Sequence, residues 1–86
     1  MELSLAFGKV LRRLRMAKNL TQEELGFESD LRRTYISSLE LGQKEPSLGT
    51  VLKISKALDM GVSELLLQVE RLHGICGGRV AEGGPE

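Results

Sequence analysis

Four polar side chains between positions 33 and 38 have the types and the spacing of a surface that recognises hydrogen-bonding groups. Residues at i, i+1, i+4 and i+5 share one face of a helix, and this is the spacing of Arg33, Thr34, Ser37 and Ser38. A solvated helix face usually carries long Glu and Lys side chains, whereas this one offers a guanidinium and three short hydroxyls. Such groups reach the edge of a base only where the helix backbone lies close to it. The pattern therefore favours a helix that enters a groove of nucleic acid.

The other side of this helix is apolar, and a second short helix precedes it. The residues expected to face the core recur at helical spacing: Leu31, Tyr35, Ile36 and Leu39. Upstream, Thr21 and Glu24 have the spacing of a capping box, in which each side chain bonds a backbone N–H group at the start of a helix. Ser29-Asp30 ends that helix, because aspartate tolerates a left-handed turn. Residues 21–42 are thus predicted to form two helices on either side of a tight turn.

Most of the chain, roughly residues 7–67, resembles a known family. The features that carry the resemblance are Leu20-Thr21-Gln22-Glu23-Glu24-Leu25, Tyr35-Ile36-Ser37, Glu40-x-Gly42, Pro46-Ser47, Leu52-x-x-x-x-Ala57-Leu58 and Val62-Ser63. Together they are similar to the phage repressor and Cro-like (Xre) family, and residues 30–37 look most like the controller proteins of restriction-modification systems. The resemblance implies an all-α, five-helix, lambda-repressor-like DNA-binding domain whose second and third helices form a helix-turn-helix. It implies a sequence-specific transcriptional regulator.

The resemblance also implies roles for individual residues. The third helix would lie in the major groove and read bases with Arg33, Thr34, Ser37 and Ser38. Arg15 and Glu40 would form a structural ion pair between the first and third helices. The expected phosphate contacts are Thr21, Gln22, Arg32, Tyr35, Gln43, Lys44 and Ser47. For Gln43, Lys44 and Ser47 the alternative is a capped surface loop, with Ser47 as the N-cap of a fourth helix.

Three residues depart from the family pattern. Gly26 stands where alanine is usual, Asp30 where glycine is most common, and Arg32 where a capping Ser or Thr is most common. Position 26 needs a small residue, because the two motif helices cross there. We expect Asp30 to be the alternative cap of the third helix, which would lengthen that helix by a turn and free Arg32 for a phosphate.

Length and charge are consistent with one small DNA-binding domain. A chain of 86 residues, 41% of them hydrophobic, has room for a single core. The net charge is zero, but it is unevenly distributed: residues 1–58 hold ten Lys and Arg against seven Asp and Glu, and residues 59–86 hold two against five. The basic part coincides with the helix-turn-helix. Since few phosphates would be neutralised, weak non-specific DNA binding is expected.

The chain shows no targeting signal and no apolar run of membrane-spanning length, so a cytoplasmic location is expected. The single cysteine, Cys76, excludes an internal disulfide and is consistent with a reducing compartment. It lies near His73, but one His and one Cys cannot complete a zinc site. We therefore expect no metal, cofactor or small-molecule ligand.

Apolar residues at helical spacing predict how the flanking helices pack. In the first helix, Leu3, Val10, Leu14 and Ala17 are expected to be buried together with Ala6 or Phe7, with Leu11 at the flank. The expected core residues of the fourth helix are Leu48, Val51, Leu52, Ile54, Ala57 and Leu58.

The fifth helix has a wider apolar surface than so small a domain can bury. We therefore expect a homodimer with Leu65, Leu66, Val69 and Leu72 at its interface; the alternative is a monomer with a partly apolar surface. A two-fold dimer sets two recognition helices about 34 Å apart, to bind a near-palindromic operator. The domain is expected to span residues 1–73, and the glycine-rich residues 74–86 to be a flexible tail.

Two other classes of function stay open. The chain could be an antitoxin of the same fold that also binds a toxin protein, or a protein-interaction module that does not read DNA. A small basic partner that co-purifies would favour the first. The absence of any sequence-preferring complex with DNA would favour the second. No constellation of residues supports an enzyme.

Overall fold

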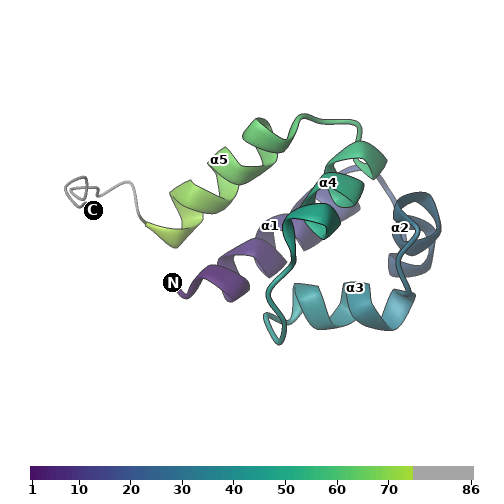
Figure 1. Cartoon of the computed structure of the whole chain (residues 1–86), viewed down its shortest axis with the longest axis horizontal. Helices are drawn as coiled ribbons and strands as arrows, with labels where there is room; N and C mark the ends of the chain where they lie inside the picture. The colour runs from purple at the N-terminus through teal and green to yellow at the C-terminus, as the bar shows by residue number, and fades with distance from the viewer. Residues whose placement is uncertain (75–86) are drawn as a thin grey trace.

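Five helices make up the part of the protein that the computed structural model describes, residues 1–74. They are α1 (Leu3–Ala17), α2 (Gln22–Ser29), α3 (Arg33–Glu40), α4 (Leu48–Ala57) and α5 (Val62–His73), and no strand occurs among the described residues. Figure 1 shows α3 along one side of the molecule and α5 along the opposite side, with α1 and α4 between them. The predicted all-α, five-helix fold is confirmed. Except for Gly74, the expected tail lies outside the described residues.

The start of α2 has the predicted capping box. The Glu24 amide donates to the Thr21 hydroxyl at 3.0 Å, and the Thr21 amide donates to the Glu24 carboxylate at 2.8 Å. Two of the N–H groups that a helix start leaves without a partner are thereby satisfied. The capping box fixes the position at which α2 begins.

The turn between α2 and α3 corrects the expectation for Asp30. Asp30 ends α2 in the left-handed conformation, with φ 60° and ψ 42°, and its amide donates back to the last turn of that helix. It therefore does not cap α3, which begins at Arg33 with Arg32 as its N-cap and no capping side chain. The turn packs tightly on Gly26, where a Cβ atom would lie 2.6 Å from the Leu31 carbonyl oxygen. Position 26 needs a small residue, as expected, and the space there is too small even for a Cβ atom.

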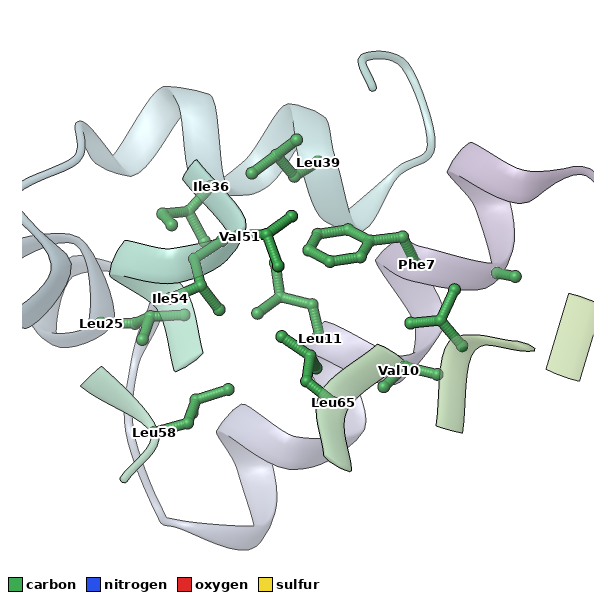
Figure 2. Close-up of a cluster of buried hydrophobic side chains, with 12 residues drawn as sticks. Phe7, Val10, Leu11, Leu25, Ile36, Leu39, Val51, Ile54, Leu58 and Leu65 are labelled. Atoms are coloured by element: carbon green, nitrogen blue, oxygen red, sulfur yellow. The ribbon is translucent and has the colours of Figure 1, made fainter. Parts of the chain in front are cut away.

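The core receives side chains from all five helices (Figure 2). Its fully buried members include Leu11, Leu25, Ile36, Ile54 and Leu65. Leu11 is central to the core, not at its flank, because α1 packs against α3 on one side and against α5 on the other. The buried face of α1 is accordingly rotated toward Leu11, and Leu3 and Ala17 are exposed.

Two other expectations about burial need correction. Leu48 and Leu52 on α4 were expected in the core but are exposed, with 83% and 48% of their surface accessible. Conversely, Leu65 and Val69 on α5 were expected at a dimer interface but are 0% and 3% exposed within one protomer. A second copy of the chain cannot reach them, because α1 and α4 already cover that face of α5.

Close contact between α1 and the end of α3 depends on Gly8. A Cβ atom at this position would lie 2.4 Å from the Leu39 carbonyl oxygen and 2.6 Å from that of Glu40. Both neighbours are backbone atoms, which cannot rotate away as a side chain can. Any larger residue at position 8 would push α3 away from α1.

We therefore expect Gly8→Ala to lower the free energy of unfolding by about 1 to 3 kcal/mol, the usual cost of overpacking. Helix propensity alone predicts the opposite sign, since alanine is favoured over glycine inside a helix. Gly49→Ala is the matched control: its Cβ would lie 3.8 Å from the Ser47 hydroxyl, an ordinary contact, so it should be neutral or stabilising. Urea unfolding followed by circular dichroism measures both. Equal stabilisation by the two substitutions would contradict the packing argument.

Candidate nucleic-acid interface

The outer face of α3 presents the polar residues singled out in the sequence. Arg33 and Thr34 are exposed, Ser37 and Ser38 are half-buried, and Ile36 and Leu39 on the inner face are fully buried. None of the four polar side chains is fully buried, although the protein's own packing partly covers Ser37 and Ser38. The helix is therefore able to bring these groups to another molecule without changing shape.

Ser38 uses part of its hydrogen-bonding capacity within its own helix. The Ser38 hydroxyl donates to the Tyr35 carbonyl oxygen at 2.7 Å, a local bond that uses its only proton. Its lone pairs stay available, so toward a base Ser38 can accept but not donate. Among the four, the Arg33 guanidinium is the strongest hydrogen-bond donor.

The start of α2 lies beside the start of α3. A shallow surface hollow is lined by Arg15, Thr21, Gln22, Glu23 and Arg33. The structure thus brings Thr21 and Gln22, two of the expected phosphate contacts, close to one expected base reader. The Thr21 hydroxyl accepts from the Glu24 amide and keeps its own proton for another acceptor.

The expected ion pair between α1 and α3 is present. Arg15 Nε lies 2.6 Å from Glu40 Oε2, and Arg15 Nη2 donates to Glu40 Oε1 at 3.1 Å, which makes the pair bidentate. The two side chains are 11% and 3% exposed. The hydrogen bonds that the Arg15 guanidinium donates to Glu40 raise the pKa of Arg15, and this effect outweighs the opposing effect of burial.

Two further hydrogen bonds extend the ion pair. Arg15 Nη1 donates to the Leu20 carbonyl oxygen at 2.7 Å, just before the capping box. Gln22 Nε2 donates to Glu40 Oε1 at 3.1 Å. The carboxylate of Glu40 therefore holds the amide of Gln22, which lies at the polar surface. The sequence indicates separate roles for Gln22 and Glu40 and does not predict this contact.

The other expected phosphate contacts lie in two places. Arg32 is exposed directly before α3, while Gln43, Lys44 and Ser47 are exposed in the loop that joins α3 to α4. In Figure 1 this loop lies at the end of α3 that is farther from α2. The candidate phosphate-binding groups therefore flank α3 at both of its ends, with the polar face between them.

Ser47 is the N-cap of α4, as predicted: its hydroxyl accepts from the Thr50 amide at 3.1 Å. The same hydroxyl donates to the Thr50 hydroxyl at 3.1 Å, and Thr50 in turn lies 3.4 Å from the Tyr35 hydroxyl. Thr50 is buried, and it is not among the site residues predicted from the sequence. The signal for it is a threonine three residues after a serine N-cap, the position at which a capping box would have Glu or Gln.

Comparison with known proteins identifies the class to which this geometry belongs. Residues 11–65 match a family described as Helix-turn-helix. The chain belongs to the helix-turn-helix family. The matched relatives include control proteins and HTH-type transcriptional regulators, and this protein is likewise a DNA-binding transcriptional regulator.

The most similar relatives of this helix-turn-helix protein include restriction-modification control proteins. It is 49% identical to the control protein C.BamHI of Bacillus amyloliquefaciens over 72% of this chain and 78% of that one. It is 47% identical to the controller protein C.AhdI of Aeromonas hydrophila, whose crystal structure superposes with a TM-score of 0.70 over 72% of this chain and 94% of the other.

A third relative is known together with DNA. The restriction-modification controller protein C.Esp1396I, described as a tetramer in complex with its natural 35 base-pair operator, is 26% identical, with a TM-score of 0.77 over 85% of this chain and 96% of the other. In that protein an arginine, a threonine and a tyrosine follow one another, and a crystal structure is known for a single variant of each. The same three types occur in the same order here, as Arg33-Thr34-Tyr35.

These relatives give no support to the antitoxin alternative. Within residues 1–74, no helix is both long enough and apolar enough to span a membrane. No cluster of three or more His, Cys, Asp or Glu side chains suited to a metal ion is found over the same residues.

The buried ion pair yields a stability prediction. Arg15→Ala should lower the free energy of unfolding by about 3 to 5 kcal/mol, because the Glu40 carboxylate would be left buried without its partner. Arg12→Ala, on the exposed side of the same helix, should change it by less than about 0.5 kcal/mol. Thermal and urea unfolding of the two variants, compared with wild type, provide the test. Similar small losses in both would show that the ion pair contributes no more than a surface contact.

Proposed function

We propose that this protein is a control-protein type of transcriptional regulator that binds a near-palindromic operator as a dimer, with α3 in the major groove. The observation that carries the proposal is the uncovered polar face of α3, with Arg33 and Thr34 exposed on a helix whose inner face is locked into the core. The operator complex of C.Esp1396I supports it, because that fold is similar over nearly the whole described chain. The proposal requires no cofactor and no catalytic activity, and it places the protein with DNA in the cytoplasm.

Base reading is assigned to Arg33, Thr34, Ser37 and Ser38. The Arg33 guanidinium suits guanine, whose O6 and N7 atoms accept a pair of hydrogen bonds in the major groove. The Thr34 methyl group suits the methyl group of thymine, and its hydroxyl can donate or accept. Ser38 is assigned only as an acceptor, since its proton is held by the Tyr35 carbonyl. Arg33 is therefore expected to contribute most to the choice of sequence.

Phosphate contacts are assigned to both ends of α3. At one end are Thr21, Gln22 and Arg32, where the first amides of α2 add a partial positive charge. At the other end are Gln43 and Lys44, together with the start of α4 at Ser47. The hydroxyls of Ser47 and Tyr35 are engaged with Thr50. The phosphate contacts at the two ends of α3 would fix the position of the protein along the duplex without selecting a sequence.

A dimer interface is assigned to the exposed part of the apolar surface. Leu66 and Leu67 on α5 are 39% and 43% exposed, and Leu3 at the start of α1 is 44% exposed beside them. Leu48, at 83%, borders an adjoining apolar groove. Leu72 is half-buried and remains at the edge of this surface. In Figure 1 α5 lies on the side away from α3, so that pairing through α5 leaves both recognition helices free.

The decisive experiment is selection of bound duplexes from a random DNA pool by the purified wild-type protein. The proposal predicts enrichment of a two-fold related sequence with half-sites about one helical turn apart. A protein-interaction module would enrich nothing. Recovery of single half-sites would support DNA reading but contradict the dimer.

Neighbouring arginines give a matched test of base reading. Arg33→Ala should weaken binding to the selected operator by about 1 to 3 kcal/mol and change binding to scrambled DNA little. Arg32→Ala should weaken both and lower the slope of log K against log salt by about 1, as expected for a lost phosphate contact. Fluorescence anisotropy on both duplexes at several salt concentrations measures these effects. If Arg33→Ala weakens both duplexes equally, Arg33 is only a phosphate contact.

The dimer interface is tested by placing a charge on it. Leu66→Glu should raise the dimer dissociation constant at least about tenfold, because a carboxylate would be buried without a partner. Phe27→Glu is the control, since Phe27 is 86% exposed but lies on α2, away from this surface. Sedimentation velocity over a concentration series reports the dissociation constants. An unchanged dissociation constant for Leu66→Glu would show that the dimer interface does not include this surface.

A further inference from the structure

Leu41, the residue directly after α3, is an exposed apolar side chain on the polar face of that helix. Its backbone is still helical, with φ −84° and ψ −2°, and its amide donates to the Ser37 carbonyl oxygen at 3.0 Å. Because a helix turns about 100° per residue, Leu41 projects in a direction between those of Ser37 and Thr34. The Leu41 side chain is 60% exposed. The face that carries the expected base readers therefore ends in a leucine.

The backbone around Leu41 is fixed by hydrogen bonds that close the end of α3. The Gly42 amide donates to the Leu39 carbonyl oxygen at 3.1 Å, and Gly42 makes the turn in the left-handed conformation, with φ 74°. The Gln43 amide donates to the Ser38 carbonyl oxygen at 2.9 Å. These two bonds are those of a Schellman motif, which occupies carbonyl groups that a helix end leaves without partners. Leu41 is thus held in a defined place relative to the base readers.

Leu41 lies between two groups of residues to which DNA contacts were assigned. The base readers precede it on α3, and the exposed Gln43 and Lys44 follow it in the loop. If phosphates are bound at both ends of α3, the whole length of the helix lies against the duplex. Leu41 would then lie over the major groove and not outside it.

The major groove offers an apolar side chain one kind of partner. The edges of the bases present hydrogen-bond donors and acceptors there, and the one apolar group is the C5-methyl group of thymine. Over a polar base edge, the Leu41 side chain would displace water without replacing its hydrogen bonds, which is costly. Over a thymine methyl group, it would remove apolar surface of both molecules from water, which is favourable. A leucine at this position therefore favours thymine.

Other exposed leucines have a different setting. Leu48 and Leu66 border one apolar groove, and Leu66 and Leu67 border an adjoining hollow, so these three belong to one apolar surface. The exposed neighbours of Leu41 on α3 are polar. Its surroundings match a base edge that presents one methyl group among hydrogen-bonding groups.

We infer that Leu41 is a further specificity-determining residue of the DNA interface, which selects a thymine by packing on its methyl group. The inference rests on the proposed function, because it requires that α3 lies in the major groove. Leu41 follows Thr34 by seven residues, which is about 10 Å along the helix axis or about three base pairs. The thymine selected by Leu41 is therefore a different one from any that Thr34 contacts, and it lies toward the phosphates assigned to Gln43 and Lys44.

The test removes the methyl group from the DNA and the leucine from the protein, separately and together. The operator selected by the wild-type protein is synthesised with uracil in place of one thymine at a time, which deletes only the methyl group. At one thymine toward the end of α3, uracil should weaken wild-type binding about threefold to fivefold, the size expected for one buried methyl group. Leu41→Ala should bind the thymine and uracil duplexes equally well at that position. Fluorescence anisotropy measures the four affinities.

Two variants serve as matched controls. Thr34→Ser removes a methyl group from the other end of the same face, so it should leave the effect of uracil at the Leu41 position unchanged. Leu52→Ala removes an exposed leucine from α4 and should leave the effect of uracil unchanged at every position. Leu41→Ala should also keep the wild-type slope of log K against log salt, because an apolar contact releases no counterion. Circular dichroism checks that each variant folds.

The outcomes separate this inference from the proposed function. If Leu41→Ala retains the full effect of uracil at every position, or if wild type shows no such effect toward the end of α3, the role of Leu41 is overturned while operator binding stands. A Leu41→Ala protein with unchanged affinity for every duplex but weaker self-association would instead assign Leu41 to a contact between copies. Failure of the wild-type protein to prefer its selected duplex over scrambled DNA would overturn the proposed function itself.

Discussion

A single buried carboxylate, that of Glu40, holds three helices at one point. It accepts two hydrogen bonds from Arg15 on α1 and one from Gln22 on α2, while its own backbone ends α3. With eight residues, α3 is too short to be stable as a free helix, so its shape and direction must come from packing. Ile36 and Leu39 provide the apolar part of that packing, and Glu40 provides the polar part. This polar contact adds to the packing of the α2–α3 turn on Gly26 in fixing the polar face of α3 relative to α2.

The features of the site that the sequence predicts are the local ones. The capping box of Thr21 and Glu24, the left-handed residue at Asp30 and the cap at Ser47 each depend on residues within a few positions of one another. The Arg15–Glu40 pair is distant in sequence and became predictable only through the family resemblance. Helical spacing alone also indicates the four polar residues of α3, because a helix fixes which side chains share a face.

The features that were missed depend on how helices contact one another. Spacing shows that α1 and α5 have apolar faces, but it does not say which part of a wide face a neighbouring helix covers. Spacing therefore predicts Leu11 at the flank, although α3 and α5 enclose it. It likewise predicts Leu65 and Val69 at a dimer interface, although α1 and α4 cover them. The contact of Thr50 with Tyr35 joins two helices across 15 positions. No local rule relates those two residues.

The two sides of α3 are held by different chemistry, and this difference suits a chain with no net charge. On the side of α1 and α2 the support is a buried ion pair, whose charges cancel, so that it adds no net charge beside the exposed Arg32 and Arg33. On the side of α4 the support is a neutral chain of hydroxyls. Neither support adds a net positive charge to the surface. Weak attraction to any duplex is therefore expected, and a preference for one sequence would have to come from the few groups that these supports hold in position.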